Sequence, residues 1–127
     1  MLVLGLILAA IAAAIHVYIF VLESLAWTTR ARAVFKLTPA EAEATKELAF
    51  NQGFYNLFLA VATVIGIVLV AAGQDGPGFA LVFVGTGSML AAALVLLRSS
   101  PAKAKSAITQ GVTPLLAVIL LITALVL

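Results

Sequence analysis

Every basic residue of this chain lies in one of two short segments, and the remainder is divided into long apolar stretches. All seven Lys and Arg fall within residues 28–48 and 98–106. The other stretches are long enough to cross a bilayer, whose hydrocarbon core needs about 20 helical residues. With 65% hydrophobic and 9% charged residues, the chain is far more apolar than a soluble domain. We therefore predict an all-α integral membrane protein that forms a four-transmembrane-helix bundle.

The turn signals divide the chain into one domain, 1–127, with four spans at about 2–27, 39–72, 79–97 and 101–127. The stretch Thr38-Pro39-Ala40-Glu41 predicts where the second helix starts. Thr38 can cap the helix, Pro39 suits the first helical position, and Glu41 completes a capping box. Gly73–Gly78 predicts a tight turn before the third span. A cleaved signal peptide ending near Ala12–Ala14 is the alternative for the first span. It is disfavoured because no basic residue precedes the apolar run.

The placement of the basic residues also predicts the topology. By the positive-inside rule both basic segments face the cytoplasm, and both termini then lie outside. A net charge of +2 concentrated in these segments is a topology signal and gives no reason to expect a nucleic-acid partner. The chain has no cysteine, which excludes disulfides, thiolate catalysis and cysteine-ligated metals.

Polar side chains gather where the second span enters the membrane. Asn51-Gln52-Gly53-Phe54-Tyr55-Asn56 leads directly into an apolar run. On the first span His16, Glu23 and Trp27 share a helix face, because their spacing follows the helical repeat. Polar groups inside a bilayer need partners and are often functional. We expect the two polar sets to contact each other or a ligand between them.

These residues also have simpler interpretations. Glu23 could end the first helix at the headgroups and pair with a basic residue, and Trp27 could be an interfacial anchor. His16 could be a neutral histidine bonded to a backbone carbonyl, and Gln110 a helix-start residue. The functional hypothesis assigns catalytic roles to His16, Glu23 and Tyr55. It assigns ligand contacts to a set of amides and one indole, namely Asn51, Gln52, Asn56, Trp27 and Gln110. A metal site is not supported, since one His and one Glu two turns apart do not complete a coordination sphere.

Three segments carry a family resemblance: His16–Trp27, Asn51–Ala60, and Gln110-Gly111 with Pro114. Together they resemble a bacterial family of small four-helix membrane proteins, catalogued as a domain of unknown function (number thirteen hundred and four). The resemblance covers nearly the whole chain and implies a multi-pass protein of the bacterial inner membrane. It implies no activity or cofactor.

A looser likeness is to the membrane-associated eicosanoid and glutathione metabolism proteins and to styrene oxide isomerase, which are trimeric four-helix bundles. Lys46 and Asn51 could stand for the first two polar residues of the glutathione enzymes' second helix. Phe54 stands where their carboxylate would be. The likeness therefore implies a fold and a trimer rather than glutathione binding.

Three functions remain open from the sequence. The first is a membrane-embedded enzyme or binding protein for a small lipophilic molecule. The second is a small proton-coupled transporter, with His16 or Glu23 carrying the proton. The third is a structural or accessory subunit. We also expect the chain to form a homo-oligomer, because helix three offers small residues for close contact. The looser likeness described above implies a trimer in preference to a dimer.

Overall fold

The computed structural model describes residues 1–127, and almost all of the chain is helical. Four helices are long and apolar enough to cross a membrane, which confirms an all-α, multi-pass architecture. The elements in chain order are α1 (Leu2–Phe20) with a π-helical turn (Val21–Leu25), α2 (Arg30–Phe35), α3 (Pro39–Ala71), α4 (Asp75–Ser99), and a 3-10 turn (Pro101–Lys103) that leads into α5 (Ala104–Val126).

Helix α3 begins where the capping box predicts. The Thr38 hydroxyl accepts a hydrogen bond from the Glu41 backbone N–H at 3.2 Å, and the Glu41 carboxylate accepts one from the Thr38 backbone N–H at 2.8 Å. These bonds satisfy N–H groups that a helix N-terminus otherwise leaves without a partner. Pro39 occupies the first helical position, where its missing N–H is not needed.

Two local features differ from the sequence-based expectation. The polar segment 28–48, in which the second helix is predicted to begin near Pro39, also contains the extra helix α2. The turn between α3 and α4 is also shorter than predicted, because α4 begins at Asp75. Gly73 ends α3 with φ of 77°, a conformation that suits glycine. Pro77 then falls in the first turn of α4, where a residue without an N–H does not interrupt the helix.

Small side chains make the closest contacts between the helices. A Cβ on Gly66 of α3 would lie 2.7 Å from the Gly78 carbonyl oxygen of α4, so these two helices meet almost backbone to backbone. A Cβ on Gly5 of α1 would similarly lie 2.8 Å from Leu121 on α5. Large apolar side chains instead remain on the outside, with Val68 and Val84 both more than half exposed. This inside-out arrangement suits a bundle whose solvent is lipid.

Only some of the small residues predicted to form a contact face on helix three pack against other helices of the chain. Gly85 is buried against the Thr63 hydroxyl of α3. Gly87 has no atom within 4 Å of an added Cβ, and Ala91 and Ala92 are exposed. Only the Gly85 side of this face therefore serves contacts within the chain.

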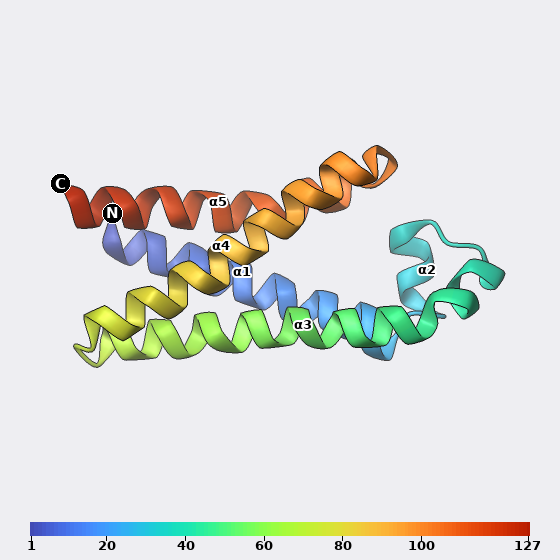
Figure 1. Cartoon of the computed structure of the whole chain (residues 1–127), viewed down its shortest axis with the longest axis horizontal. Coiled ribbons are helices and arrows are strands. Elements are labelled where there is room, and N and C mark those ends of the chain that lie inside the picture. Colours follow the sequence, from blue (N-terminus) through green and yellow to red (C-terminus); the bar gives the residue numbers. More distant parts are fainter.

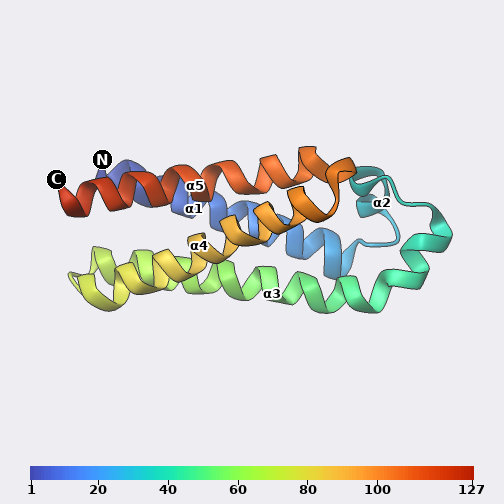
Figure 2. The same cartoon turned by 45° about the horizontal axis from the view of Figure 1, so that its top comes forward.

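Helix α4 crosses the bundle diagonally (Figure 1). It starts beside α3 and ends beside α5, at the end of the molecule that carries α2 (Figures 1 and 2). Both termini lie at the opposite end (Figure 1). Helix α5 runs through Pro114, at which the sequence predicts a kink, without an interruption of the helix.

Candidate functional site: a carboxylate–amide cluster beside a deep cleft

Glu23 is the centre of the polar cluster. Its side chain is only 6% exposed. One carboxylate oxygen, Oε1, accepts a hydrogen bond from Gln52 Nε2 at 3.1 Å, and the other, Oε2, accepts one from Asn56 Nδ2 at 2.8 Å. Gln52 and Asn56 are four residues apart on α3, so both amides project from the same helix face. A buried carboxylate thus has a partner for each of its oxygens.

The local backbone brings Glu23 to these amides. The last turn of the first membrane helix, Val21–Leu25, is π-helical, a geometry that is rare and often found at functional sites. On the facing helix Gly53 has no side chain, and an added Cβ would overlap the Ser24 hydroxyl and lie 3.1 Å from Glu23 Cβ. Ser24 Oγ donates to the Phe50 carbonyl at 2.8 Å. The two helices therefore approach most closely at the residues that form the cluster.

A cleft of about 1080 Å³ adjoins the cluster. Its α3 wall contains Thr45, Ala49, Gln52, Asn56 and Leu59, at the spacing of a single helix face. Its other walls come from α1, α2, α4 and the start of α5. Sixteen of its 27 lining residues are hydrophobic. A ligand in this cleft would meet mostly apolar surface, with Glu23 and the amides as a polar patch on one wall.

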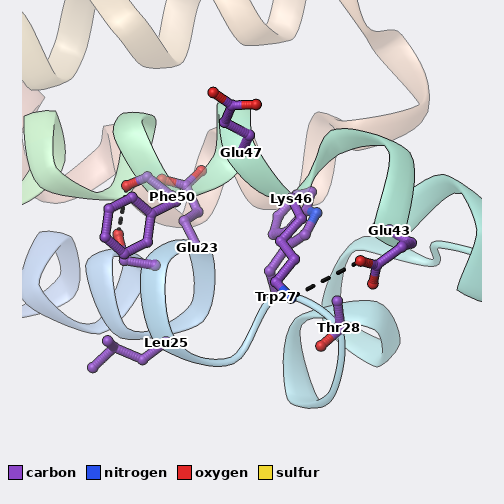
Figure 3. A pocket seen from close by; sticks show the side chains of 9 residues that line it. Glu23, Leu25, Trp27, Thr28, Glu43, Lys46, Glu47 and Phe50 are labelled. Atoms are coloured by element: carbon purple, nitrogen blue, oxygen red, sulfur yellow. Dashed lines mark hydrogen bonds and ion pairs between the residues drawn. The ribbon is translucent and has the colours of Figure 1, made fainter.

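A smaller pocket of about 410 Å³ is lined by residues of the π-helical turn, the segment after it and α3 (Figure 3). It is polar at its rim, where Lys46 and Glu43 form an ion pair at 3.9 Å. Glu23 and Trp27 line both this pocket and the cleft. These two side chains therefore border both cavities.

Trp27 connects the segment after α1 to the next helix. Its indole Nε1 donates a hydrogen bond to Thr45 Oγ1 at 3.0 Å, and its ring centroid lies 5.5 Å from that of Phe35 on α2. Thr45 Oγ1 in turn donates to the Glu41 carbonyl at 2.7 Å. The indole thus holds α2 and α3 together beside the cleft.

The remaining sequence-predicted residues divide into two groups. Tyr55 and Gln110 line the cleft, although Tyr55 is 66% exposed. His16 and Asn51 are absent from its lining. His16 is buried, with Nδ1 2.9 Å from the Ala12 carbonyl oxygen. Asn51 donates to the Glu47 carbonyl of its own helix at 3.1 Å.

Several cleft residues are not among the predicted catalytic and ligand-binding residues. From the sequence, Tyr18 is a possible partner of the polar cluster and Lys36, Lys103 and Lys105 are topology signals, and all four line the cleft. For Tyr18, the spacing of residues along the first helix is a signal that could have identified it. The cleft face of α1 carries Ile15, Tyr18, Ile19 and Leu22 at the spacing of one helix side.

Chemically the cluster is suited to hydrogen bonding. A carboxylate offers about four acceptor positions and each amide has two N–H donors and a carbonyl oxygen, so the bonds within the cluster leave capacity for a ligand. The Tyr18 and Tyr55 hydroxyls on the cleft wall add groups that both donate and accept.

The comparisons with known proteins give one match. The family model described as "Protein of unknown function (DUF1304)" matches residues 10–122. No curated protein and no solved structure matches the chain. The family match covers most of the chain, and it includes the whole carboxylate–amide cluster. The chain therefore belongs to the family of proteins of unknown function called DUF1304.

Proposed function

We propose that this membrane protein binds a small lipophilic molecule in the cleft beside the Glu23–Gln52–Asn56 cluster. The observation that carries this proposal is the cleft itself. A cavity of about 1080 Å³, with 16 hydrophobic residues among the 27 that line it, has the usual character of a small-molecule site. Its polar side chains supply orientation, and its apolar walls supply affinity.

Binding is supported more strongly than a particular reaction. A general acid or base must come within hydrogen-bonding reach of the reacting group. Of the three residues that the sequence suggested as catalytic, Glu23 and Tyr55 line the cleft and His16 does not. An enzymatic role would therefore involve Glu23 and Tyr55. His16 could contribute only indirectly, by its effect on the structure of α1.

The test uses energy transfer from Trp27, the only tryptophan of the chain. Because its indole lines the cleft, a pyrene-labelled dodecanol bound there should quench its emission in a saturable way. Protein in phosphatidylcholine nanodiscs is titrated with the probe, and unlabelled dodecanol is added as competitor. Quenching that rises linearly with probe and is not competed would mean only partition into lipid, and the proposal would be abandoned.

Two neighbouring alanines of α4 provide a matched pair of variants. Both Ala91 and Ala92 are exposed, but only Ala92 lines the cleft. Ala92→Phe places an aromatic ring in the cavity, and Ala91→Phe places the same ring outside it. Ala92→Phe should weaken saturable binding at least about tenfold, while Ala91→Phe should bind like the unaltered protein.

A second candidate, proton-coupled transport, is favoured by one observation. Glu23 lines both the cleft and the smaller pocket, so a single ionisable group borders two cavities, and such groups within membranes often mark proton or substrate pathways. Uptake of a lipophilic molecule into proteoliposomes, driven by a pH gradient and lost in Glu23→Gln, would support transport over simple binding. Equal uptake by the two proteins would exclude this role for Glu23.

We further propose that the α2 end faces the cytoplasm of a bacterial inner membrane, with both termini outside. We also propose that the protein is a homo-oligomer, a trimer in preference to a dimer. The two basic segments support this orientation through the positive-inside rule. Support for assembly comes from the small core of the single chain, in which only 25 of 127 residues are buried.

A further inference from the structure

The charged residues around the cleft are mostly basic. Lys36, Lys103 and Lys105 line it, and Glu23 is the only acidic residue that does. Three positive charges against one negative leave an excess of two. The other basic residues, Arg30, Arg32, Lys46 and Arg98, do not line the cleft.

None of these three lysines forms an ion pair with a carboxylate of the protein. The one ion pair of the structure joins Lys46 to Glu43, which lie away from the cleft. Glu23, the carboxylate that lines the cleft, already accepts hydrogen bonds from Gln52 and Asn56. The cleft therefore has three ammonium groups available for a negatively charged partner.

The lysines come from two different connections of the chain. Lys36 ends α2, while Lys103 and Lys105 lie between α4 and the first turn of α5. Both connections are at the α2 end of the bundle (Figure 1). The positive-inside rule explains why basic residues occur in these segments, but it does not require them to converge on one cavity.

The cleft extends from this basic end along an apolar interior. On α3 its lining runs from Thr45 to Leu59, which corresponds to about 21 Å at 1.5 Å per residue. Away from the lysines the walls include Ile15, Ile19 and Leu59. Positive charge at one end and a mainly apolar wall beyond it match a molecule with an anionic head and a hydrocarbon tail.

We propose that the ligand class of this cleft is a single-chain amphiphile with an anionic head group, a carboxylate or a phosphate, held by Lys36, Lys103 and Lys105. This inference rests on the proposed binding function and adds the charge of the ligand. A lysine ammonium is a compact charge without planar geometry, so the three lysines select for negative charge and accept either head group.

The test compares three probes that share a pyrene-labelled dodecyl chain: an acid, an alcohol and an amine. Each is titrated into protein in phosphatidylcholine nanodiscs at low salt and at a pH well above the carboxyl pKa. Trp27 quenching reports occupancy as before. The acid should bind about tenfold more tightly than the alcohol, and the amine more weakly than both. Added salt should weaken binding of the acid and leave that of the alcohol unchanged.

Two triple variants with equal charge change assign the effect to the cleft. Substituting glutamine for Lys36, Lys103 and Lys105 should abolish the preference for the acid while the alcohol still binds. The control substitutes glutamine for the exposed basic residues outside the cleft, Arg30, Lys46 and Arg98, and should retain the preference. Competition by lysophosphatidic acid and by dodecanoic acid then distinguishes phosphate from carboxylate as the preferred head group.

The outcomes separate this inference from the proposed function. If no probe binds saturably, the binding function itself is wrong. If acid, alcohol and amine bind equally, or if both triple variants lose the preference to the same extent, the cleft binds lipophiles without charge selection and the inference is overturned.

Discussion

The close approach of α3 to the π-helical turn at Gly53 gives a sharp prediction about stability. An alanine Cβ at Gly53 would overlap the Ser24 hydroxyl and lie 3.0 Å from the Ser24 backbone nitrogen. Gly53→Ala should therefore push the two segments apart and disturb the bond from Ser24 to the Phe50 carbonyl, now 2.8 Å long. The variant tests whether this contact holds the cluster together.

The magnitude follows from three contributions. Forcing a methyl group into a filled space costs about 1–3 kcal/mol, and losing the Ser24 hydrogen bond costs about 1 kcal/mol. The higher helix propensity of alanine returns about 1 kcal/mol. The net expectation for Gly53→Ala is a loss of about 1–3 kcal/mol of unfolding free energy. Gly87→Ala is the matched control, since nothing lies within 4 Å of a Cβ there, and it should be neutral or stabilising by up to about 1 kcal/mol.

The assay is reversible unfolding in mixed micelles with increasing sodium dodecyl sulfate, followed by Trp27 emission. Because Trp27 donates to Thr45 on α3, its emission should change when these segments separate. Ser24→Ala removes the closest clashing atom, so the Gly53→Ala substitution should be less harmful in that background. Equal stability of Gly53→Ala and Gly87→Ala would refute the claim that the contact at Gly53 constrains the fold.

Three further predictions concern the cluster, the topology and the assembly. Asn56→Leu leaves one oxygen of the buried carboxylate without its 2.8 Å bond and should lower the unfolding free energy by about 1–3 kcal/mol. The control Asn51→Leu removes only an exposed hydrogen bond within one helix. If both variants lose a similar amount of unfolding free energy, the carboxylate–amide cluster does not stabilise the fold. Single cysteines at Ala40 and Ala102 should label from the cytoplasm and one at Gly76 from outside; cytoplasmic labelling at Gly76 would reverse the proposed orientation. Native mass spectrometry in mild detergent should show a homo-oligomer, and monomer alone would contradict it.

Helix boundaries were predictable where local chemistry specifies them. The capping box at Thr38 and Glu41 fixes the start of α3 through bonds between residues three apart, so no tertiary information is needed. The start of α4 was placed too late because Pro77 and its flanking glycines were interpreted as a turn. In the structure Pro77 fits the first helical turn. Helix α2 was missed because six residues, Arg30–Phe35, are too few to show a clear periodic pattern.

The sequence by itself determined the four apolar helices and the membrane class, since these depend on the length and hydropathy of contiguous segments. It also indicated that the polar residues of the first span and the polar entry of the second can meet, because consecutive membrane helices run antiparallel. Only the tertiary structure decided which polar groups meet. Helix rotation and the π-helical turn aim Glu23 at two amides, while His16 bonds to its own helix. The diagonal course of α4 likewise brings Lys103 to the same cleft as Lys36. Such convergence depends on crossing angles, which arise from small-residue contacts distributed along whole helices rather than from any local motif.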